Sequence, residues 1–149
     1  MALNGGRIVG VGRVNFARDG ALGLYEELYG MADMAADQPA RTSISTRLMV
    51  VPEYRGSMLA ARIAMAAYGL GLARGARWNF LDCNDHLVPF FTGLGYVEHR
   101  GRVAHPEYGM VNGLVLDLEN IAALTAARSP LARVYLDHAR SGEVVSAST

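Results

Sequence analysis

The fold is decided by the stretch Arg47-Leu-Met-Val-Val-Pro-Glu-Tyr-Arg-Gly-Ser-Met-Leu-Ala60. An apolar, partly β-branched run stops at Pro52, a turn with a basic residue and a glycine follows, and an alanine-rich segment begins. This pattern predicts a strand, a loop and the start of a helix in direct succession. Such a junction directs free backbone N–H groups and the positive end of the helix dipole at one point, where Arg55 adds a full positive charge. The stretch therefore predicts a binding site for a phosphate-bearing ligand.

A second junction of strand and helix follows at Trp78-Asn-Phe-Leu-Asp-Cys-Asn-Asp-His-Leu-Val-Pro-Phe-Phe-Thr-Gly-Leu-Gly-Tyr96. Along the whole chain, the patterns predict strands at 7–16, 45–51, 77–82, 96–103 and 111–118, helices at 21–31, 57–73, 86–94 and 129–140, and a loop at 32–42. Ser57 is a candidate N-cap, and the glycines of the first strand indicate a bulge or a close neighbouring backbone. Residues 141–149 are small and polar, so we expect a disordered tail. The order of elements predicts one α/β (α+β) domain over residues 1–149.

The composition is that of a globular protein, because 51% of the 149 residues are hydrophobic and 19% are charged. The 14 basic and 14 acidic residues cancel, and no basic stripe with aromatic residues occurs, which argues against nucleic-acid binding. Arg62 interrupts the longest apolar stretch, which is shorter than the ~20 residues of a membrane-spanning helix. The N-terminus lacks a signal-peptide pattern, and the single cysteine, Cys83, excludes an internal disulfide. We therefore expect a cytoplasmic protein without a transmembrane segment.

The two junctions together resemble the core of the GNAT acyltransferase superfamily. Residues 50–56 match its motif Val-x-Pro-x-Tyr-Arg-Gly, and Phe90-Phe91 with Leu94-Gly-Tyr96 matches its later aromatic motif. The block His105-Pro-Glu-Tyr-Gly109 and the strand-like segment 112–118 more narrowly resemble the N-acyl amino acid synthases, which are related to the acyl-homoserine lactone autoinducer synthases. The resemblance extends from about Arg7 to Leu131.

The resemblance implies a mixed, mostly antiparallel sheet that is flanked by helices and split at the thioester site. It also implies that N-terminal elements are missing, because the superfamily has a strand, two helices and another strand before the segment that starts at Arg7. An exposed flank of the sheet would then need a cover, so we expect a homodimer or a start codon that is set too late.

In the resembling proteins, a bulge in the strand holds the thioester carbonyl and the pantetheine amides, and the following loop holds the pyrophosphate. Carried over to this chain, the donor site consists of Met49, Val50, Val51, Arg55, Gly56, Ser57, Met58, Leu59 and Ala60, with Asn84 on the pantetheine. The superfamily has glycine where this chain has Met58, and a methionine there would narrow the approach to a pyrophosphate. This departure favours an acyl carrier protein over coenzyme A as the carrier of the thioester.

Acyl transfer to an amine requires a neutral amine and a proton for the departing thiolate. The phenol that many of the resembling enzymes use is absent, because Phe91 occupies its position. Tyr108 and His105 are candidates to replace it, with Tyr108 as proton donor to the thiolate and His105 as proton acceptor, against the alternative that their block is only a turn. His86 is a further candidate base, and Arg47 a candidate ligand for an acceptor carboxylate, although either residue could simply be solvated.

The remaining reactive residues have simpler explanations. Asp85 fits a helix N-cap better than a catalytic acid. Cys83 fits a small buried residue better than a nucleophile. The four histidines of the chain lack tight ligand spacing, so no metal site is expected.

The resemblance thus implies an N-acyltransferase that moves a fatty acyl group from an acyl carrier protein or coenzyme A thioester to an amino acid or similar small amine. Leu59, Ile63, Leu87 and Phe91 could flank the acyl chain, or could simply be core residues. One alternative is an acetyl-coenzyme A-dependent acetyltransferase of small amines. The other is a catalytically silent domain that binds an acyl carrier or a partner subunit.

Overall fold

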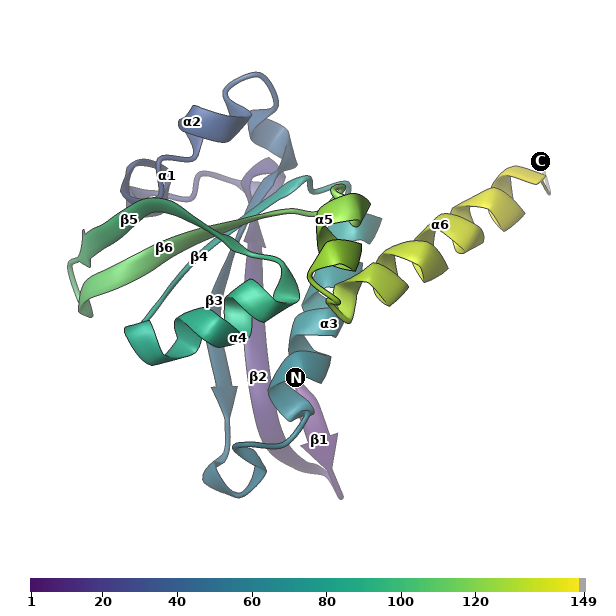
Figure 1. Cartoon of the computed structure of the whole chain (residues 1–149), viewed down its shortest axis with the longest axis horizontal. Coiled ribbons are helices and arrows are strands. Elements are labelled where there is room, and N and C mark those ends of the chain that lie inside the picture. Colours follow the sequence, from purple (N-terminus) through teal and green to yellow (C-terminus); the bar gives the residue numbers. More distant parts are fainter. Residues whose placement is uncertain (148–149) are drawn as a thin grey trace.

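The computed structural model describes residues 1–147 of the chain, which form a six-stranded sheet with helices on both faces (Figure 1). The strands are β1 (Ala2–Asn4), β2 (Arg7–Phe16), β3 (Thr42–Val50), β4 (Trp78–Cys83), β5 (Val97–His105) and β6 (Gly109–Asp117). The helices are α1 (Leu24–Leu28), α2 (Ala32–Ala35), α3 (Leu59–Ala73), α4 (Val88–Leu94), α5 (Ile121–Ala126) and α6 (Leu131–Ala147). The spatial order of the strands is β1-β2-β3-β4-β6-β5.

Two hydrophobic cores cover the two faces of the sheet. Alternate residues of β4 point to opposite faces, as the geometry of a strand requires. Leu81 and Cys83 join the larger core under α3, α4, α5 and α6, whereas Phe80 joins a smaller core with Tyr29 of the α1 segment. Helix α6 begins in the larger core and then projects away from the body of the molecule (Figure 1).

All neighbouring strands are antiparallel except β3 and β4, and this pair is open over most of its length. The parallel ladder joins only Thr42–Ile44 of β3 to 78–80 of β4. Beyond Ile44 the two strands separate, so that edge of β3 has no neighbouring strand. The predicted split in a mixed, mostly antiparallel sheet is therefore confirmed.

A bulge in β3 lies directly beside the split. Val11 pairs with Met49, but Arg13 pairs with Thr46, so β3 has one residue more than β2 in this interval. Arg47 adopts a φ of 56°, which is rare for a residue with a side chain. The resemblance placed this bulge at Met49, Val50 and Val51, which is wrong: the extra residue lies earlier, at Arg47 and Leu48.

The glycines of β2 permit the close approach of α3. The sequence left two explanations for these glycines open, a close neighbouring backbone and a bulge. A Cβ atom at Gly10 would lie 2.6 Å from Ile63 Cδ1, and one at Gly12 would lie 2.9 Å from Ile63 Cγ2. A bulge is also present, in β3, and Gly12 lies opposite it.

Several element boundaries differ from the predictions. The predicted helix 21–31 is shorter, and the predicted loop 32–42 contains α2 and a 3₁₀ turn at Pro39–Arg41. Helix α5 was not predicted, and α6 continues to Ala147 through part of the predicted disordered tail, of which Ser148 and Thr149 lie outside the described residues. The N-cap of α3 is Met58 rather than Ser57, although the Ser57 hydroxyl accepts the N–H of Leu59 at 3.2 Å.

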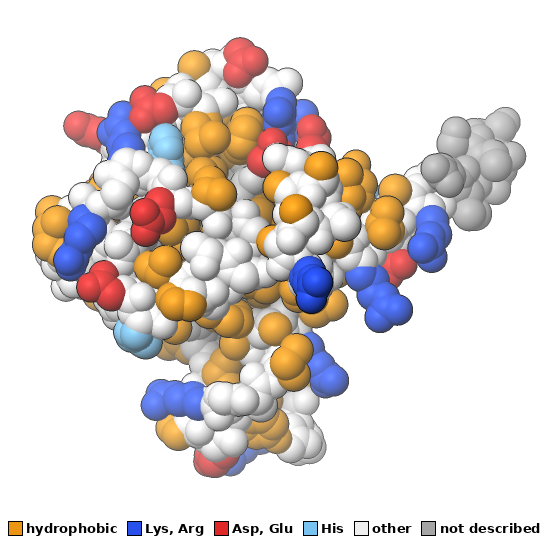
Figure 2. All heavy atoms as spheres, in the orientation of Figure 1, with side chains coloured by type: hydrophobic (Ala, Val, Ile, Leu, Met, Phe, Trp, Pro, Cys, Tyr) orange, Lys and Arg blue, Asp and Glu red, His pale blue; other side chains and the backbone are white. Residues whose placement is uncertain are grey.

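One strand precedes Arg7, which the sequence did not predict. Residues Ala2–Asn4 form β1, and the Gly5-Gly6 turn connects it to β2 as an antiparallel hairpin. No helix of the described residues is long and apolar enough to cross a bilayer. Acidic and basic side chains are interspersed over the face drawn in Figure 2, in keeping with the balanced formal charge.

Candidate functional site

A cavity of about 1070 Å³ occupies the split between β3 and β4. Its walls come from β2, β3, α3, β4, α4, the α1 segment and the turn between β5 and β6. Residues predicted from the sequence that line this cavity are Arg47, Met49, Val50, Arg55, Ala60, Asn84, His86, His105 and Tyr108. Those that do not line it are Val51, Gly56, Ser57, Met58 and Leu59.

The wall formed by β3 and α3 fits a phosphate-bearing donor. The open edge of β3 offers backbone N–H and C=O groups to an extended ligand. Arg55 lines the cavity just before α3, and Gly56 makes the turn with a φ of 79°. The first N–H groups of a helix have no intrahelical acceptor, so Ala60 and Ala61 can donate to an anion here. The sequence-based site around Arg55 thus has the geometry of an anion cradle.

Met58 lies outside this wall. Its side chain is 64% exposed and does not line the cavity. Met58 is the N-cap of α3, and the expectation that it narrows the approach to a pyrophosphate stays a prediction.

The loop after β4 contributes Asn84 and His86, whereas Asp85 has a structural role. Asp85 is not the N-cap predicted for it, because the cap position belongs to Asn84 and no side chain caps this turn. Instead, the Asp85 carboxylate accepts a hydrogen bond from Asn112 Nδ2 at 2.7 Å, which ties the loop to β6. Asn84 and His86 remain in contact with the cavity.

Cys83 is buried, as the sequence favoured. Burial raises the pKa of its thiol to about 11, and the carboxylates of Asp82, Asp85 and Glu98 contribute to this rise. A thiol with this pKa is almost entirely protonated at neutral pH and is therefore a poor nucleophile.

His105 and Tyr108 occupy the turn between β5 and β6, as predicted. His105 Nδ1 accepts the N–H groups of Glu107 at 3.0 Å and of Tyr108 at 3.3 Å. Because Nδ1 is an acceptor, neutral His105 carries its proton on Nε2. Nε2 is buried and has no hydrogen-bond partner among the described residues. A buried donor without a partner costs about 1–3 kcal/mol, so an accepting ligand atom would be stabilised there.

Tyr29 and Asp82 form a pair that was not predicted from the sequence, on the same side of the sheet as His105 and Tyr108. Tyr29 donates its hydroxyl hydrogen bond to the Asp82 carboxylate, and both residues line the cavity. Burial, followed by the Asp82 carboxylate, raises the pKa of the Tyr29 phenol. The ring of Tyr25 lies 5.3 Å from that of Tyr29 and 6.0 Å from that of His105. The spacing of Tyr25 and Tyr29 predicts a contact between their two rings, but no local pattern indicates the pairing of Tyr29 with Asp82.

The base of the split is closed by a buried polar network. Tyr96 donates to Asn79 Oδ1 at 2.6 Å, and Ser45 donates to the same oxygen at 3.0 Å. The Tyr96 hydroxyl is thus engaged, and burial raises its pKa. Phe91 packs edge-on against Tyr96, with ring centroids 5.6 Å apart. These contacts fix the point from which β3 and β4 diverge.

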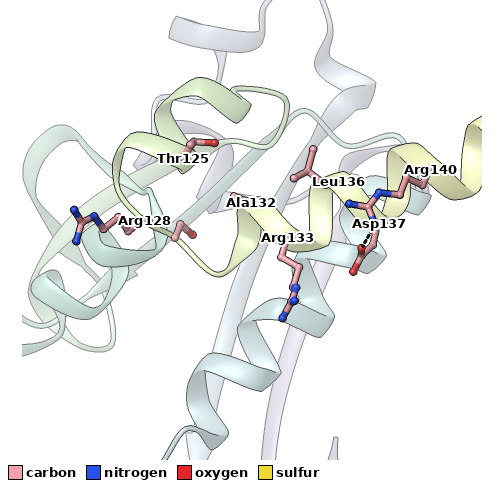
Figure 3. A pocket seen from close by; sticks show the side chains of 8 residues that line it. Thr125, Arg128, Ala132, Arg133, Leu136, Asp137 and Arg140 are labelled. Carbon is pink, nitrogen blue, oxygen red and sulfur yellow. Dashed lines mark ion pairs between the residues drawn. The ribbon is translucent and has the colours of Figure 1, made fainter.

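A second hollow, of about 760 Å³, lies between α5 and α6 (Figure 3). Arg128, Arg133 and Arg140 line it, and its carboxylate, Asp137, is paired with Arg140 at 3.8 Å. No histidine or cysteine lines it. This hollow therefore lacks the groups for acid–base chemistry that the split contains.

Comparison with known proteins identifies the fold. No protein-family model matches the chain, and no curated protein matches its sequence. Among solved structures, it is similar to a CoA-dependent acyl-homoserine lactone synthase, MesI, with a TM-score of 0.58, 22% identity, and coverage of 83% of this chain and 63% of that chain. It is also similar to FeeM, an N-acyl amino acid synthase from uncultured soil microbes, with a TM-score of 0.66, 15% identity, and coverage of 80% and 71%.

The CoA-dependent synthase BjaI, whose structure contains SAM and isopentyl-CoA, gives a TM-score of 0.57 at 18% identity, with coverage of 90% of this chain and 71% of that chain. The part of MesI that this chain covers, 63%, is less than two thirds of the length of that protein. These similarities confirm the predicted GNAT-like fold, which the chain shares with these acyl-homoserine lactone and N-acyl amino acid synthases.

Proposed function

We propose that this protein is an N-acyltransferase that moves an acyl group from a phosphopantetheine thioester to the amine of an amino acid or similar small amine. The observation that carries the proposal is the cavity in the β3/β4 split, with the anion cradle at one end and polar groups at the other. Acyl transfer needs a thioester and an amine that are held close together, and the split offers a region for each of them in one cavity.

The donor end is the wall of β3 and α3. Arg55 and the first N–H groups of α3 would bind the phosphate, and the open edge of β3 would pair with the pantetheine amides. Coenzyme A and an acyl carrier protein are both candidate donors for this end, and Met58 at the N-cap of α3 favours the carrier protein. Both donors carry the thioester on a phosphopantetheine group.

The apolar part of the cavity would hold the acyl chain. Ile63 and Ala67 of α3, Leu87, and Phe91 and Leu94 of α4 line it. An apolar cavity of this size favours a fatty acyl group over an acetyl group. Leu59, which the sequence analysis also proposed for this role, is not part of the lining.

The reaction would join the amine nitrogen to the thioester carbonyl carbon and break the carbon–sulfur bond. Starting from an ammonium group, the nitrogen loses two protons: one goes to solvent and the other leaves with sulfur as the thiol. His105 Nε2–H can donate to an oxygen that becomes negative in this step. The hydrogen bonds at Nδ1 favour this donor role over the proton-accepting role predicted for His105. Tyr108 and His86 are proposed to carry protons between the site and solvent.

The test is turnover with defined donors and acceptors. The protein would be incubated with octanoyl-CoA, octanoyl carrier protein or acetyl-CoA and a mixture of amino acids, and the products identified by mass spectrometry. The proposal predicts N-octanoyl amides and a free thiol in equal amounts, and the two octanoyl donors separate coenzyme A from carrier protein. Acetyl amides alone would support the acetyltransferase alternative, and donor binding without any amide would support the silent domain.

A further inference from the structure

One wall of the cavity is a row of four rings that ends at a carboxylate. We call Tyr29, Tyr25, His105 and Tyr108 the aromatic row. Successive ring centroids lie 5.3, 6.0 and 4.6 Å apart. At one end, the Tyr29 hydroxyl donates to Asp82. All five residues line the cavity.

The Asp82 carboxylate has one hydrogen-bond donor and no cation. Among the described residues, no arginine or histidine lies within ion-pair distance of it, and Tyr29 is its one side-chain partner. A carboxylate oxygen accepts more than one hydrogen bond, so Asp82 has acceptor capacity left for a ligand. A partly buried carboxylate without a cation is costly, and a cationic ligand would offset that cost.

The two ends of the cavity differ in charge. Arg55 lies just before α3, where the donor phosphate is proposed to bind, and Arg47 lies at the bulge of β3, where it is the candidate ligand for an acceptor carboxylate. At the end of β4, the carboxylates of Asp82, Asp85 and Glu98 act together on the Cys83 thiol. The potential therefore favours an anion at the donor end and a cation beside Asp82.

We propose that Asp82, with the faces of Tyr25 and Tyr29, binds the ammonium group of the acceptor before transfer. This assignment rests on the proposed function for the identity of that ligand. The carboxylate offers charge-assisted hydrogen bonds to the ammonium, and the tyrosine rings offer their negative faces. Asp82 is thus a binding and positioning residue that selects cationic amines over neutral amines such as anilines.

The test uses a cation that cannot be acylated. Tetramethylammonium binding is measured by saturation-transfer NMR and by competition with the acceptor in the turnover assay, with tert-butanol as a neutral molecule of similar shape. The parent protein should bind tetramethylammonium but not tert-butanol. Asp82→Asn should weaken this binding at least about tenfold and raise the acceptor KM by a similar factor, while leaving the donor KM unchanged.

The matched control is Asp137→Asn, which makes the same change on α6, at a residue that does not line the cavity. It should bind tetramethylammonium like the parent. If Asp82→Asn also binds it like the parent, or if tert-butanol binds equally well, the assignment is overturned.

Folding of each variant is checked by circular dichroism. If Asp82→Asn does not fold, Tyr25→Leu carries the test, and unchanged tetramethylammonium binding in that variant overturns the assignment. If no acceptor is turned over by the parent, the proposed function fails, whereas the NMR measurement still decides whether the cation site exists.

Discussion

In the proposed function, single residues determine which end of the cavity would hold which ligand. Arg55 supplies a fixed positive charge at the start of α3, and Asp82 supplies an uncompensated negative charge at the end of β4. His105 adds a neutral donor, because its other nitrogen is occupied by two backbone N–H groups. The chemistry of the site therefore depends on the state in which each side chain is held, and not only on which residue types are present.

The first prediction concerns Arg55. Arg55→Ala should raise the donor KM by about 10- to 100-fold, equivalent to ~1.5–3 kcal/mol, because a charge-assisted contact to phosphate is lost. Steady-state kinetics at matched ionic strength would measure this change. Arg62→Ala is the control, since Arg62 lies on α3 but does not line the cavity. An unchanged donor KM in Arg55→Ala would show that the phosphate binds elsewhere.

The second prediction concerns the turn between β5 and β6. His105→Asn, whose side-chain oxygen replaces Nδ1 as the acceptor of two backbone N–H groups, and Tyr108→Phe should each fold, and at least one should lower kcat by about 100-fold. The physical reason is the loss of the unpartnered Nε2–H donor or of the phenol beside it. His99→Gln is the control, because His99 is a histidine of the same strand that does not line the cavity. Parental kcat in both variants would mean that the turn only sets the strand register.

At the scale of elements, the local patterns of the sequence predicted the junctions well. The strand, loop and helix around Pro52 could be identified because proline and glycine end elements by local backbone chemistry. The position of the bulge could not, because it depends on the register between β3 and β2, and a register involves residues far apart in the sequence. For the same reason the Tyr29–Asp82 pair, which joins α1 to β4, was not predicted.

The bulge gives a third prediction, which separates stability from function. Arg47 has a φ of 56°, where a residue with a Cβ is strained and glycine is not. Arg47→Gly should therefore raise the free energy of unfolding by about 0.5–1 kcal/mol, measured by urea denaturation. The same variant should bind an acceptor carboxylate more weakly, because the cavity loses a positive charge. A destabilised variant would contradict this description of the bulge.

At the scale of the whole molecule, one edge of the sheet carries exposed apolar side chains. β1 has a neighbour on one side only, and its Leu3, paired with Ile8 of β2, is 59% exposed, while Ile8 itself is 51% exposed. Open strand edges with apolar side chains tend to associate. This edge supports the sequence-based expectation of a homodimer, which remains a proposal.

The fourth prediction follows from that edge. Sedimentation by analytical ultracentrifugation at micromolar concentration should give a mass near twice 16.0 kDa. Leu3→Lys should shift it towards the monomer, because a charge on the edge strand β1 opposes strand pairing. Leu136→Lys, on the projecting helix α6, is the control and should leave the dimer intact. A stable monomer in the parent protein would mean that the β1 edge needs no cover.

The central claim is that the split between β3 and β4 holds the acyl thioester. The most direct measurement is a crystal structure with an octanoyl-CoA analogue in which a thioether replaces the thioester. We predict phosphate oxygens within hydrogen-bond distance of Arg55 and the first N–H groups of α3, and a pantetheine arm along the open edge of β3. An analogue bound instead in the hollow between α5 and α6, or no binding at millimolar concentration, would contradict it.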